Sequence, residues 1–485
     1  MGFGLGGVAN IGSHSAVREG ALPSASSRHP GLWATPWVAV KVDEGAGVVA
    51  PECGSPGLAN TTTSGPSLVK HCIDFLRRVG PTRFLPCRMG RCVVAGQDPR
   101  GSIFIDPVAY ADQDAWHSVA RELRREAPVL RVEAEGYTPF WAVTRYEDVF
   151  AVSRHNDRFL NTRNSVLGPD LQYEMLGAMG IEPKTLIHMD GEEHSEHRNV
   201  ANAWFRPRAV AQRQTAIDSI AEEFIGRFRD LGGRCDFAQD IAVPYTLRVI
   251  MSIFGVPEED EPTMLRLTQG IFGAADPEYL GDLSDPFAMV TKTIAEFEDY
   301  FNAMAAERRA DPHDDLATVI ANAQVGGCPM DRHATLWYFV IVATAGHDST
   351  SFALSGGLEA LLRHPDQMKA LQADPGLVVN TTDEVIRWTS PVRHFLRYLT
   401  EPATLSGVEI PAGDRLLLSY PSANRDEIEF EEPMTFDIRR PNANRTVDFY
   451  VSTSPKAPNS RASPKHNSTP LPGNSTAALD GHLAV

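Results

Sequence analysis

Apolar residues return every three to four positions in several long segments of the chain, with polar residues between them. These segments are 114–126, 146–155, 212–231 and 286–310. This spacing puts the apolar side chains on one face of an α-helix, so the pattern predicts an amphipathic helix in each segment. All of them lie within residues 103–449, which we therefore expect to form a mainly helical globular domain.

Two stretches carry the shorter, alternating pattern that is typical of β-strands. The sequence VLRVEAEGYTPFWAVTRY, at residues 129–146, predicts two strands around a turn that contains Gly136. Further along, PAGD at residues 411–414 predicts the turn of a hairpin that includes the strand before it. The predicted fold class is therefore mainly α with a small β region.

The longest helical segment runs from residue 331 to residue 364 and is apolar at its centre. Asp331 is a suitable N-cap, because its side chain can accept from an N–H group of the first turn. Pro365 ends the segment. About 33 residues correspond to roughly 50 Å of helix. A helix of this length and polarity is predicted to run through the middle of the domain.

The two ends of the 485-residue chain differ in composition from its middle. Residues 1–102 are rich in Gly, Ser, Pro and Thr without sustained periodicity, and residues 450–485 are again of low complexity. Such segments cannot bury enough apolar surface to fold. We therefore expect both ends to be disordered, apart from one helix over residues 67–79.

The formal net charge of −17 argues against binding to nucleic acid or to an anionic membrane. No stretch reaches the roughly 18 to 20 apolar residues of a membrane-spanning helix. The N-terminus lacks the features of a secretory signal. We expect a cytoplasmic protein without a membrane span, and organelle targeting by the N-terminal region stays open as an alternative.

ATAGHDSTS, at residues 343–351, weakens the longest helix at its most apolar point. Gly346 costs about 1 kcal/mol relative to Ala inside a helix. The side chains of Asp348, Ser349 and Thr350 can bond to the backbone of the preceding turn and open it. Two interpretations stay open. Either Gly346 allows close helix packing and Asp348 is paired locally, or the opened turn meets a small polar ligand.

HMDGEEHSEHR, at residues 188–198, gathers histidines and acids at the start of a helix. His194 and His197 have helical spacing and could bind a metal ion. His194 and Arg198, one turn apart, could instead donate together to an anionic ligand. A third interpretation is a solvated helix start, with its acids near the positive end of the helix dipole. The adjacent His347 and Asp348 are also typical of metal-dependent phosphohydrolases.

DEVIRW, at residues 383–388, puts Glu384 and Arg387 on one helical face at positions i and i+3. Glu122 and Arg125 have the same spacing, so the spacing alone is typical of a solvent-exposed ion pair. A long irregular run follows the strand after PAGD, and a structured loop of this length usually braces a site.

These stretches, in this order, resemble the cytochrome P450 family of heme-thiolate monooxygenases, bacterial soluble type. AGHDST is similar to the oxygen-binding kink of the family's central helix, and EVIR is similar to its Glu-x-x-Arg pair. SANRDEIEFEEPMTFDIRR, at residues 422–440, resembles the meander, and HMDGEEHSEHR resembles the helix that holds a heme propionate. The match covers roughly residues 103–449, and its motifs look closest to those of terpene hydroxylases.

The resemblance implies roles for residues at the centre of the long helix. Asp348 would relay protons to the bound oxygen. Ser349 would stand in the place of an alcohol that is usually Thr, and Ser lacks the methyl group that limits the rotamers of Thr. Ala345 and Gly346 would leave room over the iron for oxygen and substrate.

The resemblance also implies which residues surround the heme and the substrate. His194, Arg198 and Arg397 would pair with the heme propionates, because an Arg fork suits a carboxylate. The segments 166–186 and 271–287 would cap a lipophilic substrate.

A buried structural network below the heme is a further implication of the resemblance. It would consist of Glu384, Arg387 and Arg440. The resemblance therefore overrides the interpretation of Glu384 and Arg387 as a surface ion pair.

The resemblance stops at Phe449, where the family continues with Phe-Gly-x-Gly-x-His-x-Cys-x-Gly. The Cys thiolate of this loop binds the heme iron. Tyr450 stands where the loop has Gly, Lys456 stands where it has the ligand Cys, and no cysteine follows Cys328. We therefore expect a P450-like fold that is truncated before the heme-ligand loop and the last core helix.

The expected function is heme-dependent oxidation of a lipophilic small molecule, terpene-like or steroid-like, with O2 as oxidant. Electrons would come from a ferredoxin or a flavoprotein reductase, since the sequence has no flavin or iron–sulfur segment. Two alternatives stay open: a non-catalytic remnant without the heme-ligand Cys, and a His–Asp metal hydrolase.

Overall fold

A computed structural model of the chain describes residues 97–161, 164–232, 234–272 and 286–448. Every described residue belongs to one compact unit. The helix expected over residues 67–79 lies outside the described residues. So do residues 273–285 of the expected substrate cap, and Lys456 with the rest of the C-terminal tail.

Helices make up most of the described chain, so the prediction of a mainly helical fold is confirmed. The α-helices are α2 (Gln113–Glu126), α3 (Tyr146–Arg154), α4 (Asp170–Ala178), α5 (Gly191–Asn202), α6 (Pro207–Asp230), α7 (Val243–Phe254), α8 (Glu261–Phe272), α10 (Pro286–Ala310), α11 (Leu316–Ala321), α12 (Arg332–Ala345), α13 (Asp348–Arg363), α14 (Pro365–Ala373), α15 (Val378–Thr389) and α16 (Tyr420–Ala423). Shorter 3-10 or π turns are η2 (Pro99–Phe104), η3 (Pro107–Ala111), η4 (Leu186–His188), η5 (Ala238–Ala242), η6 (Glu258–Asp260), η8 (Pro375–Leu377) and η9 (Ala443–Arg445). The turn η2 crosses the domain boundary that composition predicts at residue 102. None of the helices in the described ranges is long and apolar enough to cross a membrane.

The β region consists of one five-stranded sheet and two small hairpins. The strands are β1 (Val129–Ala134), β2 (Tyr137–Val143), β3 (Phe159–Leu160), β4 (Gln324–Val325), β5 (Cys328–Pro329), β6 (His394–Leu399), β7 (Ala403–Leu405), β8 (Val408–Ile410) and β9 (Arg415–Ser419). The large sheet has the order β1-β2-β9-β6-β3, and β4 pairs with β5 and β7 with β8. Strand β9 runs parallel to β2 and antiparallel to β6, and all five of its residues are buried.

The turn at PAGD does not close a hairpin between the strands on either side of it, so this prediction is wrong. Strand β8 before the turn pairs with β7, whereas β9 after the turn pairs with β2 and β6. Gly413 has a φ of 85°, and its N–H donates to the carbonyl of Leu399 at the end of β6. The turn therefore carries the chain out of one sheet and into another, which alternation of residue types along the sequence does not reveal.

The longest predicted helix is present as two helices, α12 and α13, with a break at Gly346 and His347. Asp331 caps α12 as expected, because its carboxylate accepts from the backbone N–H of Ala334 at 2.7 Å. The second helix ends before Pro365. The predicted opening of the turn is therefore large enough to end one helix and start another.

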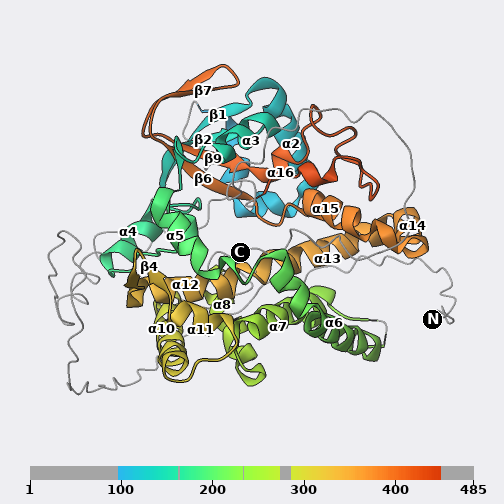
Figure 1. The fold of residues 1–485 in the computed structure, drawn as a ribbon. Helices are drawn as coiled ribbons and strands as arrows, with labels where there is room; N and C mark the ends of the chain where they lie inside the picture. The colour runs from blue at the N-terminus through green and yellow to red at the C-terminus, as the bar shows by residue number, and fades with distance from the viewer. Residues whose placement is uncertain (1–96, 162–163, 233, 273–285, 449–485) are drawn as a thin grey trace, which may run out of the picture. The chain divides into compact units, whose positions relative to one another are not determined.

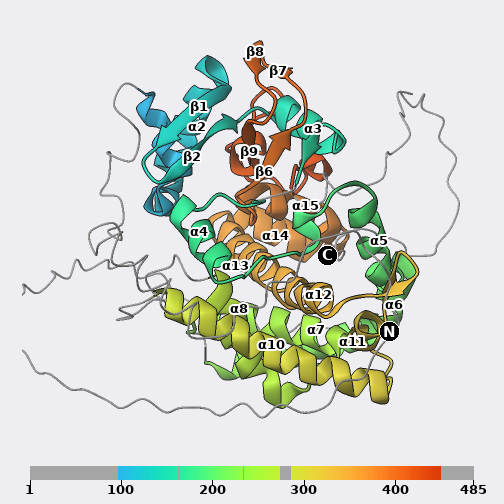
Figure 2. The same ribbon diagram turned by 90° about the vertical axis from the view of Figure 1, so that its left-hand side faces the viewer.

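The two helices follow one another between the sheet and a group of helices that includes α7, α8, α10 and α11 (Figures 1 and 2). All residues of α12 from Ala334 to Thr344 are buried. Phe339 stacks on Phe301 of α10 and also contacts Phe254 of α7. The prediction that this segment runs through the interior is thus confirmed for α12. Because the helix break directly follows α12, it also lies near the centre of the domain.

Candidate functional site

The break between α12 and α13 is held by its contacts with α7. A Cβ atom at Gly346 would lie 2.7 Å from Cγ1 of Ile250, so only glycine fits without a shift. The hydroxyl of Thr246 donates to the carbonyl of His347 at 3.2 Å. Gly346 therefore does allow close helix packing, and α7 supplies a polar partner to the interrupted backbone.

Side chains of the first turn of α13 bond back across the break. The hydroxyl of Ser349 donates to the carbonyl of Ala345 at 3.4 Å, and the hydroxyl of Thr350 donates to the carbonyl of Gly346 at 3.3 Å. This is the competition of side chains with the helical backbone that the sequence predicts. Ala345, Gly346 and Ser349 are half-buried, and Thr350 is exposed.

The adjacent His347 and Asp348 are fully buried and partly buried, respectively. The side chain of His347 is 0% exposed and that of Asp348 is 24% exposed, and Nδ1 of His347 is 3.1 Å from Oδ1 of Asp348. Burial lowers the pKa of His347 to about 4 and raises the pKa of Asp348 to about 6. Near pH 7 the imidazole is therefore neutral, and the carboxyl group is close to its titration range.

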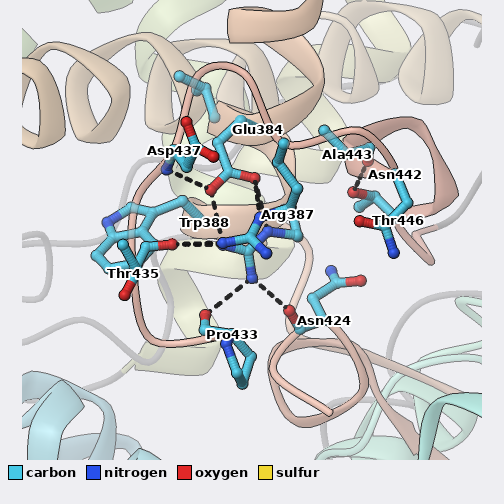
Figure 3. Close-up of polar contacts among 12 residues, drawn as sticks. Glu384, Arg387, Trp388, Asn424, Pro433, Thr435, Asp437, Asn442, Ala443 and Thr446 are labelled. Carbon is cyan, nitrogen blue, oxygen red and sulfur yellow. Dashed lines mark hydrogen bonds and ion pairs between the residues drawn. The ribbon is translucent and has the colours of Figure 1, made fainter. Parts of the chain in front are cut away.

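Glu384 and Arg387 of α15 form a bidentate ion pair in which both side chains are 0% exposed (Figure 3). Arg387 donates from Nε to Oε2 and from Nη2 to Oε1, each at 2.7 Å. Its Nη1 donates to the carbonyls of Asn424 and Pro433. The pair is therefore not the surface ion pair that its spacing alone would indicate.

Arg440 is the third member of this buried group, with a side chain that is 5% exposed. Its Nε donates to Oε2 of Glu384 at 3.0 Å, and its Nη2 donates to the carbonyl of Thr435 at 2.7 Å. The N–H of Asp437 donates to Oε1 of Glu384 at 3.0 Å. One carboxylate thus fastens two guanidinium groups and the loop that follows α16 to the side of α15.

A second cationic group is formed by α5 and β6. His194 and Arg198 lie one turn apart on α5 and are half-buried, and Arg397 on β6 is 2% exposed. Asp190, just before α5, acts electrostatically on both His194 and Arg397, so the structure brings these two residues to the same region. Burial lowers the pKa of His194, and Arg198 lowers it further.

Arg397 lacks a partner on one side of its guanidinium group. Its Nη1 donates to the carbonyl of Leu396 at 2.8 Å. Its Nη2 is buried and has no hydrogen-bond partner within residues 97–448 of the described structure. Burial lowers its pKa, while Tyr420 and Asp190 oppose this decrease. A buried cation with a free donor is the arrangement expected for a site that receives an anionic group.

The side of α5 that faces α12 leaves a small cavity of about 40 Å³. It is lined by residues of both helices, including Arg198, Tyr338 and Val342. The volume is enough for a water molecule beside polar groups. Arg198 thus lines one cavity together with residues of α12.

The metal-binding alternatives gain no support from the geometry. The ring Nδ1 of His197 lies 2.8 Å from the carbonyl of Glu193, one turn earlier in its own helix. Among the residues that the structure describes, no group of three or more His, Cys, Asp or Glu side chains could hold a metal ion. A hydrolase metal site needs more ligands than His347 and Asp348 alone supply. Glu192 and Glu193 are exposed in the first turn of α5, as the solvated interpretation expects.

Sequence reasoning missed two residues that support the Glu384 group. The side-chain amide of Asn424 donates to the carbonyl of Val447 at 3.0 Å, and its oxygen accepts from the N–H of the same residue at 2.9 Å. The guanidinium of Arg425 lies 3.9 Å from the ring centre of Trp388. Both residues lie in the stretch SANRD, at residues 422–426. The resemblance covered this stretch as a whole, and no role was assigned to its individual residues.

The interrupted central helix, the buried Glu–Arg–Arg group and the cationic group of α5 and β6 are the three features that the resemblance led us to expect. The family model described as Cytochrome P450 matches residues 97–460, and the chain belongs to the cytochrome P450 family. The match begins before residue 103 and extends past residue 449, the bounds that the motifs alone indicate.

Several curated relatives share about a third of their residues with this chain. Cytochrome P450-terp of a Pseudomonas species is 37% identical over 345 residues, which are 69% of this chain and 81% of the relative. A methyl-branched lipid omega-hydroxylase of Mycobacterium bovis is 33% identical, over 70% of this chain and 79% of the relative. A steroid C26-monooxygenase of Rhodococcus jostii is 32% identical, over 71% and 72% respectively.

Solved structures agree with this assignment. A cytochrome P450 from Novosphingobium aromaticivorans is 40% identical, with a TM-score of 0.65, over 72% of this chain and 84% of its own. A cytochrome P450 of Mycobacterium marinum in complex with pseudoionone is 29% identical, with a TM-score of 0.64, over 73% and 85%. The P450 fold is therefore shown by structure as well as by sequence.

Heme is the cofactor of this family, and the described residues fit one end of it. The unpaired Nη2 of buried Arg397, with His194 and Arg198 nearby on α5, suits the carboxylates of a heme. The iron ligand is a separate matter. Cys235 and Cys328 are the cysteines of the described part of the chain, and neither lies in a loop that follows the meander.

Proposed function

We propose that the folded domain supports heme-dependent oxidation of a lipophilic small molecule with O2. The observation that carries this proposal is the break in the buried central helix, where an acid lies half-buried beside an opened turn. A helix interior normally excludes such a group, because Gly and Asp both weaken it. A site that admits a small ligand and a proton to the centre of the domain would explain both the helix break and the acid beside it.

In this proposal the cationic group of α5 and β6 holds the heme carboxylates. Arg397 offers its free Nη2, and Arg198 and neutral His194 offer further N–H donors. Burial strengthens these contacts, because they are formed away from water. When bound, the heme supplies the activation of O2 that characterises the family.

Asp348 and Ser349 would carry protons to the site. With a pKa of about 6, Asp348 can take up and release a proton close to neutral pH. The hydroxyl of Ser349 bonds only at 3.4 Å to the carbonyl of Ala345, so it can turn toward another acceptor at small cost. Half-buried Ala345 would leave room there for oxygen and substrate, whereas Ile250 of α7 fills the space beside the Cα of Gly346.

The group of Glu384, Arg387 and Arg440 would act as structural support. It ties α15 to the loop at residues 431–437 through charge-assisted hydrogen bonds. Such bonds are roughly twice as strong as those between neutral groups. This group would keep the region below the heme in place without taking part in the reaction.

A terpene-like or steroid-like substrate is the finer part of the proposal. The motif wording and the names of the relatives, which include a methyl-branched lipid omega-hydroxylase and a steroid C26-monooxygenase, support this class. A ferredoxin or flavoprotein reductase would supply electrons, and a cytoplasmic location is part of the same proposal.

A second candidate function is non-catalytic binding of lipophilic ligands. The observation that favours it is that no cysteine follows Cys328 within the 485 residues, whereas the family takes its iron ligand from a Cys after the meander. Both candidates share the described fold. They differ in the ligand of the iron.

The absorption spectrum of the heme-loaded, reduced chain under carbon monoxide separates the two candidates. Thiolate ligation gives a strongly red-shifted Soret band and would support the monooxygenase. Bound heme without that shift would overturn the proposed oxidation for this chain and support the second candidate. Asp348→Asn serves as a matched control, since it changes the proton path without changing the iron ligand.

A further inference from the structure

His347 is a buried histidine whose ring nitrogens are both unused. Its side chain is 0% exposed, and neither Nδ1 nor Nε2 has a hydrogen-bond partner in the described part of the chain. Its backbone is fixed from two sides, because its carbonyl accepts from the hydroxyl of Thr246 and from the N–H of Ser351. These two hydrogen bonds fix the backbone of His347 in the helix break.

An unpaired imidazole in this position is costly, since a buried polar group that lacks a partner loses its hydration. An apolar residue such as Leu would fill the same space without that loss. The carboxyl of Asp348 lies within reach of the ring, with Oδ1 3.1 Å from Nδ1. The distance suits a hydrogen bond, although none is formed in this structure.

We propose that His347 is a positioning residue for Asp348. In the tautomer that carries its proton on Nδ1, the neutral ring donates to the carboxylate of Asp348 and holds it at the helix break. This inference rests on the proposed function, because it deepens the part that Asp348 plays there. His347 itself would touch neither oxygen nor substrate.

The charge states of the pair agree with this assignment. Burial keeps the imidazole neutral, so it acts as a donor and not as a counter-ion. The helices packed on the break and on α13 carry other titratable groups, but burial is the cause that shifts His347 and Asp348, and none of these groups contributes. They are Asp240, Tyr245, Arg248, Arg332, His333, Tyr338, Asp366, Lys369, Asp383, Glu384 and Arg387.

The test is a pH titration of the Asp348 carboxyl in the full chain. The titration is monitored by NMR on protein labelled with 13C at the aspartate carboxyl. The variant Asp348→Asn assigns the resonance. His347→Leu removes the donor to the charged form, so we expect the pKa of Asp348 to rise by about one unit. His347→Asn puts an amide N–H near the position of Nδ1, and we expect it to restore the pKa to within about 0.3 units.

His155→Leu is the matched control, because His155 is exposed at the end of α3 and its ring contacts the carbonyl of Ala151. An unchanged pKa in His347→Leu, or equal values in His347→Leu and His347→Asn, would overturn the proposal. If His347→Leu does not fold, His347→Gln replaces it, since its amide lies near Nε2 and should leave the pKa raised. The titration needs no heme, so its outcome is independent of whether the proposed oxidation holds.

Discussion

Replacing Glu384 by Gln removes the only carboxylate that the buried guanidinium groups of Arg387 and Arg440 contact within the described residues. In the native structure this carboxylate accepts four hydrogen bonds, two from Arg387, one from Arg440 and one from the N–H of Asp437. The amide of Gln keeps one acceptor oxygen but puts an NH2 group, itself a donor, in place of the other. The substitution therefore leaves two buried positive charges without the carboxylate that both of them contact.

The expected loss is large because all three side chains are buried. Exposed fractions are 0% for Glu384, 0% for Arg387 and 5% for Arg440. Breaking a buried ion pair by removing one partner costs about 3–5 kcal/mol. That is a large share of the roughly 5–15 kcal/mol by which a folded domain is stable.

Glu359→Gln is the matched control, because Glu359 pairs with Arg363 at i,i+4 on α13 with exposed fractions of 62% and 74%. The same chemical change should cost less than about 0.5 kcal/mol at this exposed site. Urea unfolding of the three proteins, followed by tryptophan fluorescence, measures both differences. A loss of under 1 kcal/mol in Glu384→Gln, or a loss equal to that of the control, would refute the account of the network.

Two further predictions concern the helix break. Gly346→Ala puts a Cβ 2.7 Å from Cγ1 of Ile250, so we expect a loss of about 1–3 kcal/mol in the free energy of unfolding. This loss should be smaller in an Ile250→Ala background, and equal losses in both backgrounds would exclude the clash as the cause. Asp348 binds its proton more tightly in the folded chain, where its pKa is about 6, than at its ordinary value of 3.8. Its ionisation therefore weakens folding as the pH rises from about 4 to 6, by up to about 3 kcal/mol. Asp348→Asn has no carboxyl group to ionise, so its free energy of unfolding should rise relative to that of the native chain as the pH increases over this range. Urea unfolding measures both free energies, and a difference between them that does not change with pH would contradict the raised pKa.

Helical periodicity predicted much of the fold because amphipathic helices carry their own signal. The segment expected at 286–310 is α10 with the same bounds, and the strands around Gly136 are β1 and β2. The hairpin at PAGD failed because strand pairing depends on residues far away in sequence. Leu399, which binds the turn at Gly413, gives no local sign of doing so.

Residue spacing also could not predict which ion pairs are buried. Glu122 and Arg125 have the same i,i+3 spacing as Glu384 and Arg387, yet the first two are exposed on α2. What separates the pairs is Arg440, which follows Glu384 by 56 positions and completes the group. Only the resemblance to the family indicated this third member before the structure did.

Equilibrium binding of heme to the native chain and to Arg397→Met tests the central claim, that the described residues form the carboxylate end of a heme site. Arg397→Lys serves as a control that keeps the charge but loses the planar fork. Titration followed by absorbance should give one heme per native chain, at least tenfold weaker binding to Arg397→Met, and intermediate binding to Arg397→Lys. Absence of heme from the native chain, or equal affinity in all three proteins, would contradict the account.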